Sequence, residues 1–474
     1  MRIINTSFEG LFILETNNFQ DERGCFQKLF NYDFFEKNGL ATDFKEFYYS
    51  LNKKGVRRGM HFQSPPYDHV KVVYVSKGRI MDVVVDIRKY SKTYGMCFSL
   101  ELDDQKAQYL YIPKGFAHGF LSLEDNTIVN YAQTSCYNKD CDCGIDQNSI
   151  DFDWGIDNPI VSGRDLTFPA LSDFNTPFKR MNILITGATG FIGTNLTREL
   201  RKEHNLFILG QFEGDPEKLG LPGCVMTDDI YQLASFIKEN RIDGIIHLAS
   251  LYLTVHSSGQ VKDLVSSNVY FGTAVLEAAS LAGCVKWFLN TGSIWQNYNT
   301  KGMEYNPVNL YAATKQAFID MAKYYTDVFG IKFCTLKLCD TYGPNDTRRK
   351  IFKLFKDYSE SGELLKMSPG EQLIDLLYIT DIIAGFKKLA ELLASNSELG
   401  DEYVLTSGKQ IPLKDLAQLF SKVSGRKLNI EWGGRPYRER EVMIPWKGVP
   451  VPEWRAMIGV EDGIRLFLGM SEEI

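Results

Sequence analysis

The stretch Met181-Asn-Ile-Leu-Ile-Thr-Gly-Ala-Thr-Gly-Phe-Ile-Gly193 decides the fold of the larger part of this chain. Its apolar run Ile183 to Ile185 predicts a buried strand, and Thr194 to Glu203 predicts an amphipathic helix. The glycines between them are Gly187, Gly190 and Gly193. Glycines let a backbone turn sharply and approach a pyrophosphate at a helix N-terminus, although the same spacing also occurs in ordinary βα turns.

The position of this stretch predicts a second domain before it. The chain has 474 residues, which is too long for one core, and Met181 resembles the start of a protein. The segment from Gly155 to Arg180 contains three prolines and no sustained periodicity, so it is interpreted as a connector. We place the boundary near Phe178 and predict domains over residues 1–178 and 179–474.

Composition excludes several classes of protein. A net charge of -6 without a basic stripe argues against a nucleic-acid partner. No apolar run approaches membrane-spanning length and the N-terminus lacks a signal-peptide core, so we expect a cytoplasmic protein without membrane contact. Nine scattered cysteines are typical of reduced thiols. Cys136, Cys141 and Cys143 cluster without a fourth zinc ligand, so no metal is expected.

The first domain has the pattern of an all-β fold. Short apolar segments separated by turns, clearest at Val70–Val75, Ile80–Ile87 and Tyr109–Ile112, predict a β-sandwich or barrel. Tyr32–Asn38 is the one helix predicted there.

His61 is the first candidate functional residue. It stands alone in its segment, whereas a metal cage would need two or three histidines and a carboxylate, so a structural histidine beside Arg58 is the simplest interpretation. Lys71, ten residues further on, and Asp165, a free carboxylate after the last strands, favour a functional role instead.

Five motifs in order carry a family resemblance. They are Phe19-Gln-Asp-Glu-Arg-Gly-Cys-Phe26, Gly55-Val-Arg-Arg-Gly-Met-His-Phe-Gln63, Lys71-Val-Val73, Asp82-Val-Val-Val-Asp-Ile-Arg88 and Ile112-Pro-Lys-Gly-Phe-Ala-His-Gly-Phe120. Over nearly all of residues 1–170 the chain resembles the dTDP-4-dehydrorhamnose 3,5-epimerase family. The resemblance implies a metal-free cupin-type jelly roll and a homodimer formed through this domain.

The resemblance also implies roles for single residues. His61 with Asp165 would be the base dyad, Lys71 would hold the enolate oxygen, and Tyr131 would be the acid on the opposite face. The residues expected to bind substrate are Arg23, Arg58, His118 and Tyr137. Arg23 and Arg58 would face the nucleotide diphosphate, while a packed structural role is an equal alternative for His118.

The chemistry explains these residue types. A C4 ketone acidifies the protons at C3 and C5, so a base that titrates near neutrality can remove one if a cation stabilises the enolate. Reprotonation from the other face inverts the centre. Glu46 and Tyr48 replace the Gln and Asn with which the family commonly recognises the nucleobase of the substrate. The loop around Cys141 also differs from the family. The nucleobase and the choice of C3, C5 or both therefore stay open.

After the glycine stretch, strands and helices alternate. The predicted elements are a strand at 206–209, a helix at 230–240, a strand at 244–249, a helix at 263–282 and a strand at 286–290. This alternation predicts a doubly wound parallel sheet of the Rossmann type, with the ligand at the carboxyl ends of the strands.

Tyr311 and Lys315 carry the candidate chemistry of this domain. They are four residues apart, so both side chains fall on one helix face, and an ammonium beside a phenol is expected to lower the phenol's pKa. Such a pair is common by chance as a surface pair. Thr291 and Ser293, which end the preceding strand, could supply a hydroxyl to the same substrate oxygen.

These residues resemble the extended short-chain dehydrogenase/reductases that act on sugar nucleotides, with a small C-terminal substrate subdomain. By that resemblance Tyr311 donates the proton, Lys315 binds the nicotinamide ribose, and Thr291, favoured over Ser293 by its spacing from Trp295, is the catalytic hydroxyl. The cofactor-binding residues implied are Gly187, Thr189, Gly190, Phe191, Ile192, Gly193, Asp229, Ile230, Leu248, Ala249, Tyr311 and Lys315.

Two further features concern the substrate. The segments Asn306–Lys315, Tyr342–Arg348 and Trp432–Met443 resemble CDP-abequose synthase-type 4-ketoreductases, which favours CDP over dTDP or GDP as the nucleotide. Arg348 and Arg435 are candidates for the diphosphate because guanidinium forks match phosphate oxygens, although surface ion pairs are the alternative.

Cofactor preference is predicted from the end of the second strand. A carboxylate there would bind a ribose 2′-hydroxyl and repel a 2′-phosphate. The chain has Gly210-Gln-Phe at this point, with Glu213 three residues after Gly210. We therefore expect NADP(H), with NAD(H) as the alternative.

Both halves point to one substrate type, a 4-keto sugar nucleotide. The sequence predicts a bifunctional enzyme that epimerises C3 and/or C5 of an NDP-4-keto-6-deoxy sugar and then reduces C4 with NADPH, for surface polysaccharide biosynthesis. One alternative is a 4-ketoreductase whose inactive cupin serves dimerisation. Another is a sugar-nucleotide-binding module without turnover.

Overall fold

The computed structural model describes residues 1–211, 214–395 and 398–470. The chain divides into two compact units, Met1–Arg180 and Met181–Ile474. Each unit has its own hydrophobic cores.

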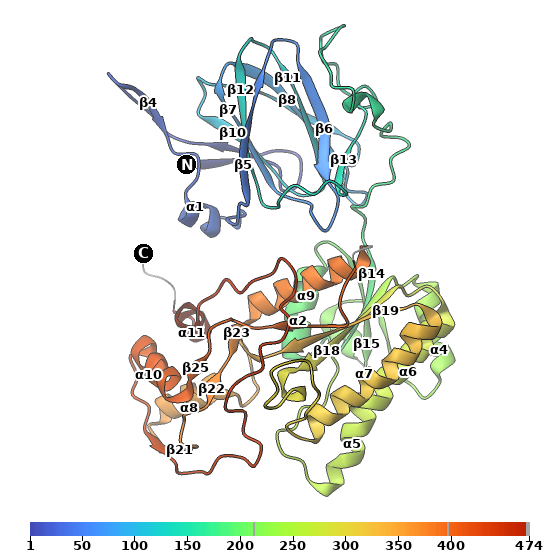
Figure 1. Ribbon diagram of the computed structural model, residues 1–474, viewed down its shortest axis with the longest axis vertical. Coiled ribbons are helices and arrows are strands. Elements are labelled where there is room, and N and C mark those ends of the chain that lie inside the picture. The colour runs from blue at the N-terminus through green and yellow to red at the C-terminus, as the bar shows by residue number, and fades with distance from the viewer. Residues whose placement is uncertain (212–213, 396–397, 471–474) are drawn as a thin grey trace. The chain divides into compact units, whose positions relative to one another are not determined.

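The first unit is a sandwich of two antiparallel sheets (Figure 1). One sheet has the strand order β1 (Arg2–Asn5), β2 (Phe12–Glu15), β10 (Gln108–Ile112), β7 (Lys71–Lys77), β12 (Thr127–Gln133) and β5 (Glu46–Asn52). The other has the order β13 (Asp142–Gly144), β6 (Arg57–Gln63), β11 (Phe116–Ser122), β8 (Arg79–Asp86) and β9 (Cys97–Asp103). The predicted all-β jelly roll is confirmed.

Strand alternation decides which side chains face the space between the sheets. Val73 of β7 and Val129 of β12 belong to the core between the sheets, as do Ile80 and Val84 of β8. Since side chains two residues apart share a face, Lys71, Tyr131 and Asp82 also point inward. The interior of the sandwich therefore contains both its apolar core and its polar candidate residues.

Two smaller elements flank the sandwich. The helix α1 (Tyr32–Lys37) begins at Asn31, whose side chain accepts a hydrogen bond from the backbone N–H of Phe34, and it buries Phe35 against the outer face of the six-stranded sheet. A separate hairpin is formed by β3 (Asn18–Asp21) and β4 (Gly24–Gln27).

The second unit is built on one parallel sheet. Its strand order is β16 (Gly223–Val225), β15 (Asn205–Gly210), β14 (Asn182–Thr186), β17 (Gly244–His247), β18 (Trp287–Ser293), β19 (Lys332–Leu338) and β24 (Glu402–Leu405). The order reverses direction between β14 and β17, and ligands bind at such points in doubly wound sheets. The predicted Rossmann-type sheet is confirmed.

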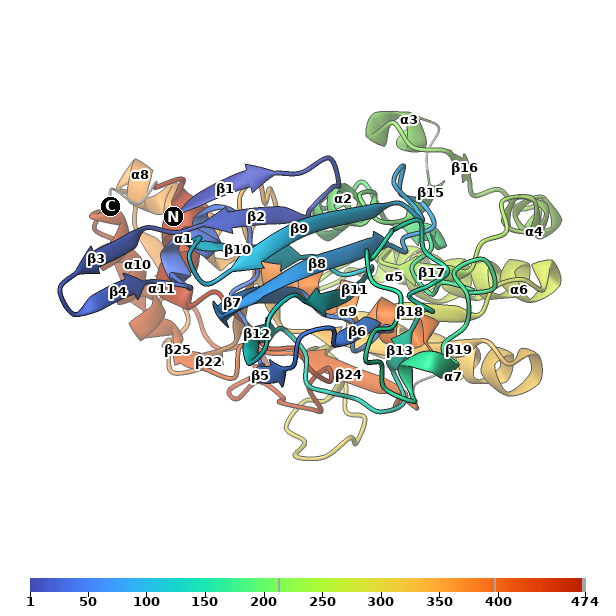
Figure 2. The same cartoon turned by 90° about the horizontal axis from the view of Figure 1, so that it is seen from above.

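Helices cover both faces of this sheet (Figure 2). Ile183 of β14 packs with α2 (Phe191–Leu200) and α9 (Ile379–Ala394) on one face. The neighbouring Leu184 points to the opposite face, where the covering helices are α4 (Ile230–Glu239), α6 (Phe271–Ala282) and α7 (Leu310–Phe329). The continuous apolar run of β14 is thus buried on both sides, as expected for a central parallel strand.

Short helices and strand pairs outside the seven-stranded sheet form the predicted C-terminal subdomain. They comprise α8 (Ile351–Ser361), α10 (Leu413–Ser424), α11 (Val460–Leu468) and the strand pairs β20 (Asp340–Tyr342) with β23 (Leu376–Tyr378), β21 (Leu365–Met367) with β26 (Ile430–Trp432), and β22 (Leu373–Ile374) with β25 (Ile411–Pro412). Among the described residues, no helix combines the length and the apolar character needed to cross a membrane.

Two predicted helices differ from the structure. The helix expected from Thr194 begins at Phe191, because Gly193 can enter the first turn: a Cβ on it would lie 2.3 Å from the carbonyl oxygen of Gly187. The helix expected from Asp263 to Ala282 is divided into α5 (Val261–Val265), a π-helical turn at Ser266–Tyr270, and α6. A π-helical turn adds a residue to the helix and frequently marks a functional site.

Candidate active sites

The first candidate site has a wall formed by two histidine–carboxylate pairs. His61 on β6 and His118 on β11 are direct partners in the register of the two strands. His61 Nε2 lies 2.9 Å from Asp165 Oδ1, and His118 Nε2 lies 2.8 Å from Asp82 Oδ2. A carboxylate in this position orients an imidazole and fixes its tautomer.

The facing wall comes from the other sheet. Lys71 begins β7 and Tyr131 lies on β12, and both side chains are buried. The phenol oxygen of Tyr131 is 3.3 Å from Ser50 Oγ, and its ring stacks on Tyr48 with centroids 4.7 Å apart. Burial raises the pKa of Tyr131, so the phenol holds a proton at neutral pH. The structure therefore brings the four residues predicted for epimerisation to two opposed walls.

The charge of Lys71 depends on its surroundings. Burial lowers the pKa of Lys71 to about 8, while the carboxylates of Asp82 and Asp142 act in the opposite direction. His61, Lys71 and His118 line one cavity with about 270 Å³ of empty volume.

This pKa predicts an alkaline limb for proton exchange at the first site. Lys71 is charged below a pH of about 8 and loses its proton above it, so the rate of deuterium uptake by a 4-keto sugar nucleotide should fall as the pH rises past about 8. In Lys71→Arg the fall should disappear from this range, because guanidinium keeps its proton. The pH profile of uptake, measured by mass spectrometry, checks this; a fall at the same pH in both proteins would contradict it.

Asp82 was not predicted as a site residue. Its side chain is fully buried, and within the described residues its Oδ1 has no hydrogen-bond partner. The sequence feature that could have identified Asp82 is its position as an acidic residue inside the apolar run Ile80–Ile87, because a buried charge needs a partner.

Other predicted residues of this domain are placed less centrally. Asp165, expected to be a free carboxylate, is buried in a short turn and also accepts a hydrogen bond from the backbone N–H of Gly59. Arg58 donates from Nε to Asn52 Oδ1 at 2.9 Å. Arg23 lies at the tip of the β3–β4 hairpin, exposed and paired with Asp21, and Tyr137 is exposed in the loop after β12. Of the predicted residues of this domain, His61, Lys71 and His118 line the cavity, whereas Arg23, Arg58, Tyr131, Tyr137 and Asp165 are not among its lining.

The second candidate site is a larger cavity at the carboxyl ends of β14, β17 and β18, with about 1010 Å³ of empty volume. The predicted residues that line it are Gly187, Gly190, Phe191, Ile192, Gly193, Leu248, Thr291, Ser293, Tyr311, Lys315 and Arg348. The predicted residues that are not among its lining are Thr189, Asp229, Ile230, Ala249 and Arg435. Asp229 instead caps α4 by accepting hydrogen bonds from the backbone of the helix.

The glycine turn leaves the start of α2 open to an anion. Gly190 is the capping residue and has no side chain to accept hydrogen bonds from the first N–H groups of the helix. Gly187 has a φ of +68°, and a Cβ there would lie 2.6 Å from the backbone nitrogen of Ala249. The turn therefore fits a pyrophosphate bound at a helix N-terminus.

Substitution of Gly193 should damage this turn. In Gly193→Ala the new Cβ meets backbone atoms of Gly187 and Ala188, so we expect a loss of about 1–3 kcal/mol of stability and weaker dinucleotide binding. Thermal unfolding and quenching of intrinsic fluorescence by NADPH measure the two effects. Gly259→Ala is the matched control, since nothing lies within 4 Å of its Cβ position. Equal behaviour of the two variants would contradict the assignment.

The two candidate hydroxyls on β18 differ in their partners. Ser293 Oγ accepts a hydrogen bond from the backbone N–H of Trp295 at 3.2 Å, which caps the next turn. Thr291 Oγ1 is buried and, within the described residues, has no hydrogen-bond partner. Thr291 is therefore the hydroxyl available to a ligand.

Burial shifts the pKa values of both Tyr311 and Lys315. Burial raises the pKa of Tyr311 to about 12, which differs from the lowering expected from the nearby ammonium. Burial also lowers the pKa of Lys315 to about 7, so the ammonium is only partly charged near neutral pH. The aromatic rings of Tyr252 and Trp295, 5.1 and 6.4 Å from the Tyr311 ring, form an apolar wall.

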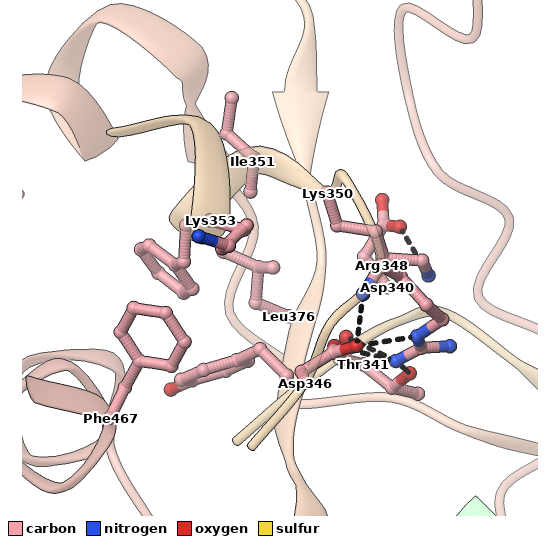
Figure 3. A pocket seen from close by; sticks show the side chains of 11 residues that line it. Asp340, Thr341, Asp346, Arg348, Lys350, Ile351, Lys353, Leu376 and Phe467 are labelled. Atoms are coloured by element: carbon pink, nitrogen blue, oxygen red, sulfur yellow. Dashed lines mark hydrogen bonds and ion pairs between the residues drawn. The ribbon is translucent and has the colours of Figure 1, made fainter. Parts of the chain in front are cut away.

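Of the two predicted diphosphate candidates, Arg348 lines this cavity and Arg435 does not. Figure 3 shows the guanidinium of Arg348 turned toward Asp346 and Thr341, with Nε 2.8 Å from Asp346 Oδ1. Its other face lies over the ring of Phe191, the first residue of α2, at 4.6 Å. Arg435 is exposed, and its backbone N–H donates to the carbonyl oxygen of Met367.

Two cations near the cavity were missed. The guanidinium of Arg438 lies 5.3 Å from the centroid of the Trp295 ring, and the ammonium of Lys350 lies 5.6 Å from that of Tyr252. Arg435, Arg438 and Arg440 occur close together in the sequence, so the segment signalled a basic group but not which arginine reaches the site.

Comparison with known proteins agrees with this division of the chain. Residues 5–173 match the family model of dTDP-4-dehydrorhamnose 3,5-epimerase, and residues 183–405 match that of the NAD dependent epimerase/dehydratase family. The dTDP-4-dehydrorhamnose 3,5-epimerase of Methanothermobacter thermautotrophicus is 41% identical over 177 residues, which is 36% of this chain and 95% of the relative. The chain belongs to the dTDP-4-dehydrorhamnose 3,5-epimerase family through its first domain.

Other relatives extend the comparison. The dTDP-4-dehydrorhamnose 3,5-epimerase of Escherichia coli is 41% identical over 166 residues, which is 34% of this chain and 88% of the relative. A UDP-glucose 4-epimerase structure from Thermotoga maritima covers 61% of this chain and 98% of its own, with a TM-score of 0.53 and 19% identity, and shows the fold alone. The predicted order of a dTDP-4-dehydrorhamnose 3,5-epimerase domain followed by a domain that matches the NAD dependent epimerase/dehydratase model is confirmed. Among the described residues, no group of three or more histidine, cysteine or acidic side chains could hold a metal ion.

Proposed function

We propose that the chain is a bifunctional sugar-nucleotide enzyme. Its first domain epimerises C3 and/or C5 of an NDP-4-keto-6-deoxy sugar, a hexose or heptose that includes the 3,6-dideoxy class, and its second domain reduces the C4 ketone with NADPH. The product would serve surface polysaccharide biosynthesis. The proposal is supported by the grouping of candidate proton-transfer residues in each domain, since these groups suit two steps that share a 4-keto intermediate.

In the first step, His61 would remove the proton next to the ketone. Asp165, 2.9 Å from His61, orients the imidazole and stabilises it when it becomes charged. Lys71 would hold the enolate oxygen, because a buried ammonium interacts strongly with a developing negative charge. Tyr131, which holds its proton on the opposing sheet, would deliver that proton to the other face and so invert the centre.

In the second step, Tyr311 would give its proton to the C4 oxygen while Thr291 Oγ1 holds that oxygen. A bound reduced nicotinamide supplies the hydride. The residues fit such a group, since α2 begins with an uncapped N-terminus and Thr291 is a buried hydroxyl without a partner. Lys315 gains its charge fully once an anionic ligand is near, and that charge would then ease proton release from Tyr311.

The preference for NADP(H) is supported by the end of β15. Gly210 and Gln211 carry no carboxylate themselves. The buried carboxylate of Asp215 does lie at this strand end, where it accepts a hydrogen bond from the backbone N–H of Gln211 at 3.2 Å, and this contact favours the alternative. Glu213 lies outside the described residues. NAD(H) is the alternative.

The same proposal covers the nucleotide and the assembly. CDP is the favoured nucleotide because of the abequose synthase-like segments, with dTDP and GDP as alternatives. Arg348 lines the second cavity and Arg438 lies over Trp295, which also lines it, and either guanidinium would suit a diphosphate. The first domain would form a homodimer.

One experiment tests both steps. The full chain is incubated in D2O with CDP-, dTDP- and GDP-linked 4-keto-6-deoxyhexoses, first without and then with NADPH or NADH, and the products are weighed by mass spectrometry. Deuterium at C3 or C5 followed by cofactor-dependent gain of two hydrogens is the expected result. Reduction without deuterium uptake would favour a ketoreductase with an inactive first domain. Binding without either reaction would favour the non-catalytic alternative.

A further inference from the structure

Residues 160–169, which we call the strap, run along the outside of the first domain and are fixed at both ends. At one end Ile160 forms an isolated parallel bridge with Val56, just before β6. At the other end the carbonyl oxygen of Pro169 accepts a hydrogen bond from the backbone N–H of Asp146 at 2.8 Å. The middle of the strap is therefore held against the sandwich.

The middle of the strap carries the carboxylate of the candidate base dyad. Asp165 Oδ1 lies 2.9 Å from His61 Nε2, and Asp165 Oδ2 accepts a hydrogen bond from the backbone N–H of Gly59 at 3.2 Å. In the neutral imidazole, Nε2 donates its hydrogen to this carboxylate, which leaves Nδ1 as the nitrogen that can accept a proton. The position of Asp165 therefore decides which nitrogen of His61 acts as the base.

Two further side chains of the strap hold this dyad. The ring of Phe168 meets the ring of His61 edge to face, with centroids 5.7 Å apart and an interplanar angle of 81°. The guanidinium of Arg164 lies over the same Phe168 ring at 5.2 Å, and its Nη2 is 2.6 Å from Asp142 Oδ2. A guanidinium that stacks on a ring and pairs with a carboxylate is held at two points. A continuous set of contacts thus joins β13, through Arg164 and Phe168, to His61.

A glycine of β13 makes room for the Phe168 ring. Gly144 is the register partner of His61 in the pairing of β13 with β6. A Cβ on Gly144 would lie only 2.3 Å from Phe168 Cε2. The ring therefore occupies the space that a side chain at this position would fill, directly beside the histidine.

We propose that Arg164 and Phe168 are positioning residues that clamp Asp165 against His61 for proton abstraction. This inference rests on the proposed epimerisation. In that step the C–H bond next to the ketone breaks, its proton passes to His61 Nδ1, and its electron pair forms the enolate. Asp165 keeps its hydrogen bond to Nε2 throughout, and neither Arg164 nor Phe168 exchanges a proton. The clamp keeps Nε2 on the carboxylate, so Nδ1 stays free to accept the proton.

The first test does not depend on turnover. The full chain is labelled with ¹⁵N in its histidine rings, and the His61 resonances are assigned by their absence in His61→Asn. At a pH at which His61 is neutral, the wild type should show two well-separated ring nitrogen shifts, because one tautomer is held by Asp165. In Arg164→Gln and Phe168→Leu the two shifts should move toward each other. Shifts that stay at their wild-type values in both variants would overturn the proposal.

Deuterium uptake supplies a second readout. With the active 4-keto sugar nucleotide in D2O, Arg164→Gln and Phe168→Leu should lower kcat for uptake by about tenfold or more, because a misplacement of about 1 Å can cost about 10²-fold. KM should change little, since neither residue is assigned to substrate binding. Arg164→Lys keeps the charge opposite Asp142 without the planar stacking, so its rate should lie between those of Arg164→Gln and wild type. A change in KM alone would contradict a positioning role.

The matched control is an arginine elsewhere in the same domain. The side chain of Arg79 is exposed to a similar degree as that of Arg164, and it pairs with Glu101 at 3.4 Å. Arg79→Gln should leave both the His61 shifts and the uptake rate at their wild-type values. A loss of rate in Arg79→Gln equal to that in Arg164→Gln would contradict the specific role of the clamp.

Asp142→Asn separates position from charge. Asp142 opposes the lowering of the Lys71 pKa by burial, so loss of Arg164 also changes the field at Lys71. If Arg164 acts by position, Asp142→Asn should lower uptake as Arg164→Gln does, because both break one pair. If it acts by charge, the alkaline limb should move up in Arg164→Gln and down in Asp142→Asn with an unchanged plateau, which would overturn the proposal. If wild type takes up no deuterium, the proposed epimerisation fails, while the histidine shifts still decide the clamp.

Discussion

Tyr311→Phe should lower NADPH-dependent reduction of a 4-keto sugar nucleotide by about 10³-fold, within the range of about 10²–10⁴ for loss of a general acid. The substitution removes one oxygen, and the Phe ring can keep the contact with Tyr252, whose ring lies 5.1 Å from that of Tyr311. The loss should therefore appear in kcat, with little change in NADPH binding. Single-turnover consumption of NADPH measures it.

The matched control for this variant lies on the same helix. Tyr324→Phe removes a phenol oxygen from an exposed position of α7, and it should leave the reduction rate unchanged. Deuterium uptake in the first domain should also be unaffected in both variants, because that reaction uses other residues. Full reduction activity in Tyr311→Phe would rule out this tyrosine as the acid.

The second large effect is expected at His61. His61→Asn should reduce deuterium uptake at C3 or C5 by about 10³-fold, since the base that starts the reaction is lost. Asp165→Asn should reduce uptake less, because the imidazole is retained while its orientation and charge stabilisation are weakened. Mass spectrometry of a 4-keto sugar nucleotide incubated in D2O measures both rates.

The reductase activity of the second domain is the folding control for the His61→Asn variant. The second domain of His61→Asn should still consume NADPH with a substrate that needs no epimerisation, which would show that the chain is folded. His256→Asn, at an exposed position in the second domain, should leave both reactions intact. If uptake in His61→Asn equals that of wild type, the base lies elsewhere, and the His118–Asp82 pair becomes the next candidate.

The sequence predicted the architecture because the hydrophobic periods were clear. The short apolar segments of the first domain predicted a β-sandwich or barrel, which the family resemblance narrowed to a jelly roll, and the repeated strand–helix order of the second predicted a parallel sheet. The start of α2 was misplaced because a glycine was interpreted as part of the turn, whereas Gly193 packs inside the helix against the carbonyl of Gly187. The division of the helix before α6 was also missed, because no local propensity marks a π-helical turn.

The candidate sites were predicted in part. Motif spacing located His61, Lys71, Tyr311 and Lys315, which the structure places in the walls of the two cavities. The choice of Thr291 over Ser293 agrees with its lack of a protein partner.

The remaining residues depend on tertiary contacts that lie far apart in the sequence. Asp82 on β8 reaches His118 on the neighbouring strand β11, and the guanidinium of Arg438 lies over the ring of Trp295. The direction of the Tyr311 pKa shift could not be predicted from i,i+4 spacing either, because burial of the phenol is its largest cause. Spacing identifies pairs on one helix, but it does not report how deeply they are buried.

The opposed walls of the first site have a consequence for its evolution. His61 and His118 lie on paired strands of one sheet, and Lys71 and Tyr131 lie on paired strands of the other, so the placement of residues within each wall is set by strand register and not by a loop. A one-residue insertion in β6, β7, β11 or β12 would turn these side chains to the opposite face. Lineages of this domain should therefore vary in length at the turns while these four strands keep their length, and activity should be lost before the sandwich itself is.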